Sequence, residues 1–127
     1  MSRLLLDSHV VVWMLADSPR LGPSARAAIV AAEQVCVSVV SPWELAIKRA
    51  LGRLDMPDDL VDLLDQRGAT WLAIEPADGL AAAALPRLHG DPFDRMLVAQ
   101  AIRASLTIMT ADPAIGAYAA PVVDASN

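Results

Sequence analysis

Short runs of apolar residues alternate with segments of helical pattern along the whole chain. The apolar runs are residues 4–6, 35–40, 71–74 and 106–109, and residues 122–123 offer a further edge strand. Between the runs, apolar spacing and bounding prolines and glycines predict helices. Strands that alternate with helices form a parallel sheet with helical crossovers. We therefore expect an α/β fold in three layers, with a central parallel sheet of four to five strands flanked by helices.

Length and composition limit what such a chain can be. It has 127 residues, which predicts a single domain spanning residues 1–127. Its composition is 55% hydrophobic, which indicates either apolar surface that a partner covers or simply a high alanine content. The net charge of −5 gives no broad electrostatic footprint for nucleic acid. A nuclease is not excluded, because a bound metal would offset the acids at the site itself.

Cysteine content and targeting signals give a further expectation. Cys36 is the only cysteine, which excludes an intrachain disulfide and a thiolate metal cluster and predicts a small buried hydrophobic side chain. No stretch approaches the roughly 20 apolar residues of a membrane span. The apolar residues after Arg3 are not followed by the small-residue cleavage site of a signal peptide. We expect a cytoplasmic protein that does not contact a membrane.

Four acidic residues stand where an apolar run gives way to a predicted helix. They are Asp7, Glu44, Asp94 and Asp112. In a parallel sheet these carboxylates can converge at the carboxyl edge, where open α/β sheets bind ligands. Two carboxylates 4 Å apart repel each other by roughly 4 kcal/mol at an effective dielectric constant of about 20. The pattern therefore predicts a divalent metal with oxygen ligands, and with it metal-assisted cleavage of a phosphodiester.

The same acids also have a structural interpretation as helix caps. Ser41-Pro42-Trp43-Glu44 has the sequence of a capping box with Ser41 at the N-cap, and Asp91 and Asp112 each precede a proline. Asp7 fits this interpretation least well, because it ends a buried strand, where an unpaired carboxylate is costly. Capping and metal binding are compatible, since a helix N-terminus stabilises a carboxylate.

Several neighbours of the acids are secondary candidates. Ser8 and Thr110 are placed to hydrogen-bond a carboxylate or phosphate, or to cap the backbone locally. Lys48 lies four residues after Glu44, so an ion pair between them is favoured over a contact with substrate. Arg95 is placed either to contact RNA phosphate or to form an ion pair on the helix surface.

Aromatic and histidine residues add little to this pattern. His9 and His89 lack partners at metal-ligand spacing, and neither is favoured as a ligand or general base. Trp13, Trp43 and Trp71 are interpreted as core or partner-interface residues rather than as base-stacking platforms.

Four segments that contain the acids carry a family resemblance. They are residues 5–9 (LLDSH), 38–44 (SVVSPWE), 89–101 (HGDPFDRMLVAQA) and 106–112 (LTIMTAD). In this order they resemble the PIN-domain ribonucleases, and among these the VapC-type toxins of bacterial toxin–antitoxin pairs. The resemblance covers almost the whole chain, and its most specific part is residues 91–101.

The resemblance implies a PIN-like fold and roles for the acids around Mg²⁺ or Mn²⁺. Matched by motif, Asp7 and Asp94 correspond to the principal metal ligands, and Glu44 corresponds to a ligand or a water-positioning acid. Asp112 corresponds to a more peripheral acid that binds metal directly or through water. These four are the predicted catalytic and metal-binding residues, while Asp91 is assigned a supporting position beside them.

The resemblance also implies an RNA substrate, cleaved by water to a 3′-hydroxyl and a 5′-phosphate. It further implies a homodimer and a cognate antitoxin that covers helix grooves and directs an arginine into the acidic site. Two alternatives remain open from the residues themselves. One is a metal-dependent DNA nuclease or phosphatase on the same acidic edge. The other is a non-catalytic RNA- or protein-binding module whose acids are all helix caps.

Overall fold

A central parallel sheet organises the protein. The computed structural model describes residues 2–88 and 90–127, so the sequence interpretation of His89 lies outside the described residues. Within these residues five strands pair in the order β3-β2-β1-β4-β5, and every neighbouring pair is parallel. The strands are β1 (Arg3–Leu6), β2 (Gln34–Ser38), β3 (Thr70–Leu72), β4 (Thr107–Thr110) and β5 (Val122–Asp124). The predicted α/β fold with four to five parallel strands is confirmed.

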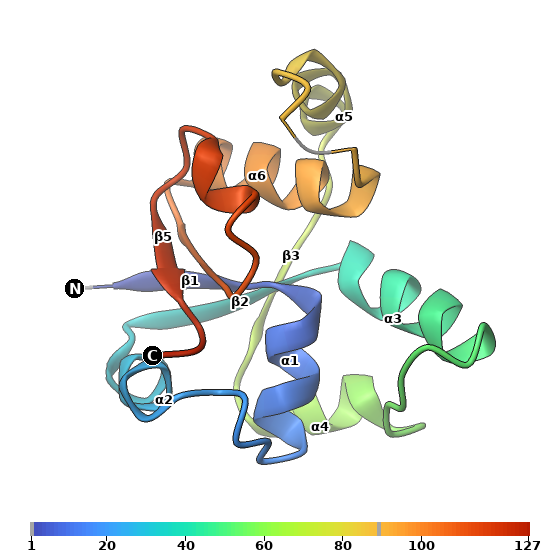
Figure 1. Ribbon diagram of the computed structural model, residues 1–127, viewed down its shortest axis with the longest axis vertical. Helices are drawn as coiled ribbons and strands as arrows, with labels where there is room; N and C mark the ends of the chain where they lie inside the picture. Colours follow the sequence, from blue (N-terminus) through green and yellow to red (C-terminus); the bar gives the residue numbers. More distant parts are fainter. Residues whose placement is uncertain (1, 89) are drawn as a thin grey trace.

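Helices cover both faces of this sheet, which confirms the three predicted layers. In Figure 1, α6 and α5 lie above the sheet, and α1, α2 and α4 lie below it. Helix α3 lies beyond the carboxyl end of β2, beside the N-terminal ends of α1 and α6. The helices are α1 (Ser8–Leu15), α2 (Pro23–Ala31), α3 (Val40–Ala50), α4 (Leu60–Gln66), α5 (Pro76–Ala84) and α6 (Pro92–Ala104), with a 3₁₀ turn at Ile115–Ala117. Within the described residues, none of these helices has the length and apolar content that a membrane span requires.

The alternating side chains of β1 divide the core into two parts. Leu4 and Leu6 pack on one face with residues of α1, α3 and α4, while Leu5 packs on the other face with residues of α6. Cys36 lies beside Leu5 in the sheet and is buried, as predicted. Burial raises the pKa of its thiol. Both faces of the central strands are therefore apolar, which explains why their sequences read as continuous apolar runs.

The junction between β2 and α3 differs from the sequence prediction. The strand ends at Ser38 rather than at Val40, because the Ser38 hydroxyl accepts a hydrogen bond from the Val40 N–H at 3.1 Å. Helix α3 therefore begins at Val40, and Ser41 lies inside it. The capping box with Ser41 at the N-cap is thus wrong. The end of α3 agrees with the prediction, since Gly52 follows it with a left-handed φ of +72°.

The order of the strands reverses at the centre of the sheet. The chain moves outward from β1 to β2 and β3, then crosses back to place β4 on the other side of β1. In sheets of this kind, ligands bind outside the carboxyl ends of the strands at the point where the order reverses. Asp7 directly follows β1 at this point, and its N–H donates to the Met109 carbonyl of β4 at 3.0 Å.

Gln100 connects α6 to the sheet through a fully buried amide. Its Oε1 accepts a hydrogen bond from the Ser38 hydroxyl at 2.7 Å, and its Nε2 donates to the carbonyls of Leu72 and Ala73 at 3.2 Å. These contacts hold α6 against the ends of β2 and β3. They therefore fix the distance between α6 and α3, which begins two residues after Ser38.

We predict that Gln100→Leu lowers the free energy of unfolding by about 2–3 kcal/mol, because it leaves a buried hydroxyl and two carbonyls without their donor or acceptor. The loss should appear as a fall in the midpoint of chemical denaturation. Gln66→Leu on the exposed end of α4 is the matched control and should change the stability by less than about 0.5 kcal/mol. Equal stability of the two variants would contradict the role given to Gln100.

Candidate metal centre

Asp7 lies buried at the start of α1. It is the N-cap of this helix, and its Oδ1 accepts a hydrogen bond from the His9 N–H at 3.0 Å. The Thr110 hydroxyl, at the end of β4, donates to Oδ2 at 2.6 Å. Only 4% of Asp7 is exposed to solvent. The first turn of α1 therefore holds one carboxylate oxygen, and the end of β4 holds the other.

The surroundings of Asp7 disfavour its charge. Burial raises the pKa of this carboxyl, and the negative charge of Glu44 adds to the effect. The hydrogen bonds from Thr110 and from the His9 N–H act in the opposite direction but do not cancel it. A cap alone would be served as well by serine or asparagine. An ionised carboxylate at this position is thus costly until a cation approaches it.

Glu44 lies on α3 and is 2% exposed, and its Oε1 is linked to the start of α1 through Ser8. The Ser8 hydroxyl donates to its Oε1 at 2.6 Å and lies 3.0 Å from the hydroxyl of Ser41. The Lys48 ammonium donates to its Oε2 at 2.6 Å, which confirms the predicted ion pair. Glu44 is therefore held by side chains from α1 and α3 rather than by the N-terminal backbone of its own helix.

Asp91 and Asp94 come from the first turn of α6. Asp91 is the predicted N-cap, and its Oδ1 accepts hydrogen bonds from the N–H groups of Phe93 at 2.8 Å and of Asp94 at 3.4 Å. Three carboxylate oxygens lie within 4.8 Å of one another, one each from Glu44, Asp91 and Asp94. The structure thus brings Glu44 and Asp94 together, and it adds Asp91 to them.

This set of oxygens fits a hard divalent cation. Oxygens on opposite sides of an octahedral Mg²⁺ are about 4.2 Å apart, since each bond is about 2.1 Å long. The observed separation needs only small side-chain movements to reach that value. Among the described residues, Asp7 lies outside this set of three but close enough for the Glu44 charge to act on it. The sequence assigned Asp91 only a supporting position, whereas the structure places it in the set itself.

Asp112 lies further out on the same edge. Its N–H donates to the Thr110 hydroxyl oxygen at 3.0 Å, and that hydroxyl donates in turn to Asp7. Its Oδ1 accepts a hydrogen bond from the Ala114 N–H at 2.9 Å. The predicted N-cap role of Asp112 is nevertheless wrong, because the following 3₁₀ turn begins at Ile115 with Ala114 as its N-cap. Asp112 is therefore coupled to the buried acids through Thr110, and its side chain serves the turn after β4.

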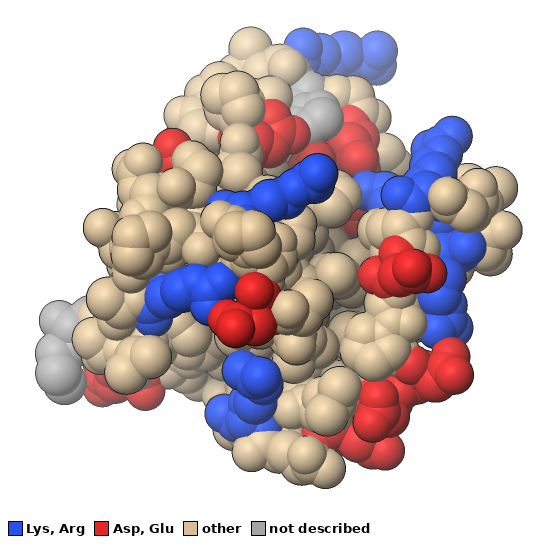
Figure 2. Space-filling model, turned by 60° about the horizontal axis from the view of Figure 1, so that its bottom comes forward, with Lys and Arg blue, Asp and Glu red and all other residues tan. Residues whose placement is uncertain are grey.

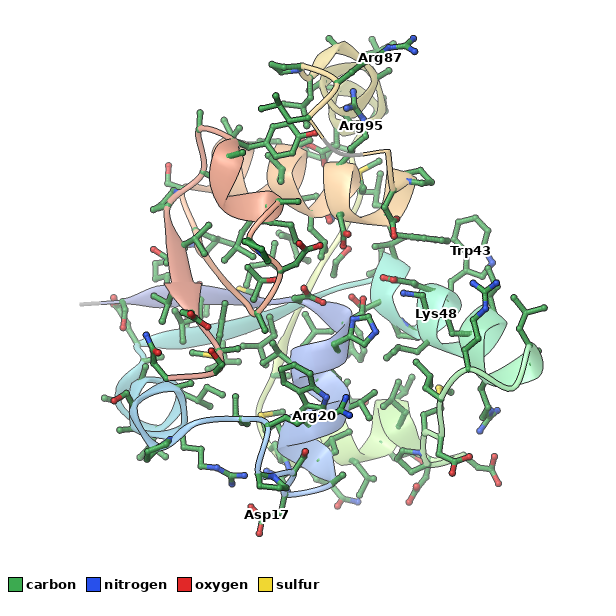
Figure 3. The ribbon with its side chains drawn as sticks, viewed as in Figure 1. Asp17, Arg20, Trp43, Lys48, Arg87 and Arg95 are labelled. Carbon is green, nitrogen blue, oxygen red and sulfur yellow. The ribbon has the colours of Figure 1, made fainter. Side chains whose placement is uncertain are left out.

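Lys48 supplies positive charge among these acids. Burial lowers the pKa of its ammonium, but the hydrogen bond to Glu44 and the charges of Glu44, Asp91 and Asp94 raise it by more. In Figure 3, Lys48 lies on α3 on the side that faces α6 and α1. The ammonium therefore lies within the electric field of the same three carboxylates that make up the candidate metal set.

Two other candidates take different positions. The guanidinium of Arg95 points toward α5, away from Lys48, and donates to the carbonyls of Ala82 and Leu85 at 2.8 Å (Figure 3). It joins α6 to the end of α5, a role that the sequence did not predict. Trp43 is 63% exposed on α3, and its ring meets Phe93 edge to face at 5.3 Å. It lies beside the acids without entering their hydrogen-bond network.

Comparisons with known proteins identify the family and the fold of the chain. The PIN domain family model matches residues 4–121. Ribonuclease VapC22 of Mycobacterium tuberculosis is 32% identical over 124 residues, which cover 95% of each chain. Two solved structures share the fold: FitAcB from Neisseria gonorrhoeae (TM-score 0.62, 21% identity, 95% and 96% coverage) and a toxin–antitoxin complex from Klebsiella pneumoniae (TM-score 0.67, 16% identity, 95% and 96% coverage).

We predict that Asp7→Asn stabilises the metal-free protein at neutral and mildly alkaline pH. The folded-state pKa of Asp7 is raised above its unfolded value, so the stability associated with its protonated form is lost as the pH rises through the folded pKa. Asparagine retains an acceptor for the His9 N–H and carries no charge. Melting temperatures measured with a chelator should favour the variant most near pH 8 and least near pH 4.

The matched control is Asp62→Asn, an exposed acid in the first turn of α4. It should shift the melting temperature by no more than about 2 °C, because exposed substitutions change stability by less than roughly 0.5 kcal/mol. An Asp7→Asn protein that melts below the unmodified chain at pH 8 would show that the buried charge is not unfavourable.

Proposed function

Because this chain belongs to the PIN domain family, we propose that it is a metal-dependent endoribonuclease that hydrolyses RNA phosphodiester bonds as the toxin of a toxin–antitoxin pair. The similarity to a VapC ribonuclease over nearly the whole chain supports the reaction class. The observation that carries the proposal is the meeting of Glu44, Asp91 and Asp94 oxygens within 4.8 Å at the carboxyl edge of the sheet.

Four acids would bind Mg²⁺ or Mn²⁺, with Asp91 beside them: Asp7, Glu44, Asp94 and Asp112. When bound, the metal activates a water molecule for attack on phosphorus and offsets charge on the phosphoryl oxygens. The hydroxyls of Ser8 and Thr110 hold Glu44 and Asp7 in orientation through hydrogen bonds of 2.6 Å. The N-terminal ends of α1 and α6 favour negative charge at Asp7 and Asp94. Hydrolysis in this scheme requires no protein nucleophile.

RNA would be held by local contacts rather than by a broad positive surface. The net charge is −5, and Figure 2 shows acidic and basic side chains side by side over the visible face. Charge of this kind gives little non-specific attraction for phosphate backbones. Selection of the RNA would therefore depend on its shape and on the few groups around the acids.

An antitoxin would use the apolar hollow beneath α1 and α2. A hollow of about 400 Å³ lies there, lined by Met14, Leu21, Ile29 and Val30 together with Asp17, Arg26 and Arg67. Val30 is largely exposed, so a partner segment could bury it. This lining suits a peptide with apolar side chains and an acidic group.

A homodimer would use helix α3. Val39, Trp43, Ile47 and Leu51 follow one another at four-residue spacing and are each between 36% and 63% exposed. Residues four apart lie on one face of a helix, so these side chains form a continuous apolar stripe. Exposed stripes of this kind mark interaction surfaces. A second copy of α3 would bury the stripe symmetrically.

We expect Asp94→Asn to lower RNA cleavage by roughly 100-fold or more, since the loss of supporting groups around catalytic metals alone costs 10–100-fold. Cleavage is measured with labelled RNA at matched Mn²⁺ concentrations, and the melting temperature checks the fold. Asp62→Asn serves as the control and should cleave like the unmodified protein. Unchanged cleavage by Asp94→Asn would refute the assignment of the site.

The same assay separates the alternative substrates. RNA, single-stranded DNA and a simple phosphate monoester are offered at equal phosphate concentration. Preferred cleavage of DNA or of the monoester would replace the ribonuclease proposal with one of the alternatives.

Ile47→Glu is expected to convert a dimer into a monomer, because it places a charge in the middle of the α3 stripe. Light scattering coupled to size-exclusion chromatography measures the mass. The matched control is Val30→Glu, which changes an exposed apolar residue on α2 and should leave the mass unchanged. A monomeric unmodified protein, or a dimeric Ile47→Glu variant, would contradict this interface.

A further inference from the structure

Lys48 is the only lysine of the chain, whose other nine basic residues are arginines. It lies one helical turn after Glu44 on α3, and its side chain is 21% exposed. Its Nζ lies 2.6 Å from Oε2 of Glu44, one of the three acids of the candidate metal set. The one lysine of the sequence is therefore placed beside a cluster of three carboxylates.

Both oxygens of Glu44 are occupied in this arrangement. Oε1 accepts the Ser8 hydroxyl and Oε2 accepts the Lys48 ammonium, each at 2.6 Å. Glu44 is nearly fully buried, so water does little to satisfy it. A divalent ion that binds Glu44 through Oε2 would stand within about 4 Å of the ammonium. Cations repel strongly at that distance in a partly buried site.

The ammonium also interacts with the other two acids of the set. The negative charges of Asp91 and Asp94 act on Lys48 in addition to the direct contact with Glu44. The same three carboxylates thus attract the ammonium and would attract a metal ion. Lys48 supplies, in the metal-free protein, part of the positive charge that such an ion would bring.

A lysine ammonium is easier to displace from a carboxylate than an arginine guanidinium is. Its ammonium is a compact, strongly hydrated point charge on a flexible chain, whereas the arginine fork holds a carboxylate with two parallel hydrogen bonds. An arginine at residue 48 would bind Glu44 more rigidly and would be harder to displace. A lysine satisfies the buried acid while leaving the contact reversible.

We propose that Lys48 is a built-in counter-cation that neutralises the acidic site of the metal-free protein, and that a divalent ion must displace its ammonium from Glu44 in order to bind. This inference rests on the proposed function, since it concerns the same metal site. It makes metal binding an exchange of cations, in which the ammonium moves outward to solvent as the ion enters. Metal affinity is then set by the strength of the Lys48–Glu44 pair.

Calorimetric titration with Mn²⁺ tests the exchange directly. Lys48→Met removes the competing charge and should bind Mn²⁺ about tenfold more tightly, which corresponds to about 1.4 kcal/mol. Lys48→Arg retains a competing charge and should bind no more tightly than the unmodified protein. Arg49→Met removes a positive charge from the next residue of α3, which pairs with Asp58 at 2.8 Å, and should change the affinity less than twofold.

Thermal stability distinguishes the exchange from a purely structural ion pair. Lys48→Met should melt at a lower temperature than the unmodified protein in chelator, because it leaves a buried carboxylate unpaired. Saturating Mn²⁺ should remove that difference. A deficit of equal size with and without Mn²⁺ would mean that the ion pair serves only the helix, and the proposal would be wrong.

Because the sequence has a single lysine, NMR can follow its ammonium group directly. Reductive methylation with ¹³C-formaldehyde labels Lys48 and the terminal amine while retaining the charge, and Lys48→Arg identifies the Lys48 signal by its loss. Addition of Mg²⁺ should shift that signal in proportion to the occupancy found for Mg²⁺ by calorimetry. An unchanged signal at saturating Mg²⁺ would overturn the displacement.

Failure of this inference is distinguishable from failure of the proposed function. If Mn²⁺ binds the unmodified protein and Lys48→Met with equal affinity, and Asp94→Asn abolishes binding, the metal site stands and the exchange is wrong. If Mn²⁺ binds none of these proteins, the metal site itself is wrong and the inference falls with it.

Discussion

The crowding of carboxylates at the carboxyl edge of the sheet is the constraint on which the rest of the structure depends. Asp7 is buried with a raised pKa, and Glu44, Asp91 and Asp94 approach within 4.8 Å. Unscreened charges at such distances repel by several kcal/mol. The protein offsets this repulsion with hydroxyl donors, helix N-termini and the Lys48 ammonium. Each of these is weaker than a divalent cation, so the site remains receptive to one.

The fold makes this crowding possible by joining segments that are far apart in the chain. Strand order reverses between β1 and β4, which brings Asp7 and Thr110 together at the carboxyl ends of these two strands. The buried amide of Gln100 ties α6 to β2 and β3 and so sets Asp94 against α3. Apolar packing on both faces of β1 keeps these elements fixed. The acids are thus held in place by a rigid frame, while Lys48 reaches them with a flexible side chain.

Capping residues predicted the ends of two helices correctly. Asp91-Pro92 marked the start of α6, and Gly52 marked the end of α3 with a left-handed φ. The capping-box pattern wrongly placed the N-cap of α3 at Ser41. The Ser38 hydroxyl accepts a hydrogen bond from the Val40 N–H, and the helix already begins at Val40. Arg95 was considered for phosphate or an ion pair, but carbonyls at the end of α5 receive it. In both cases the partner lies outside the local window from which the prediction was made.

The sequence by itself determined the class of fold, the acids at the strand ends and the i,i+4 pairing of Lys48 with Glu44, because periodicity, caps and helix spacing are properties of neighbouring residues. Only the tertiary structure decided that Ser8 and Thr110 hold the buried carboxylates and that Asp91 joins Glu44 and Asp94. Those contacts join α1, α3, α6 and β4. Their distances follow from how helices pack on a twisted sheet, which no local pattern specifies.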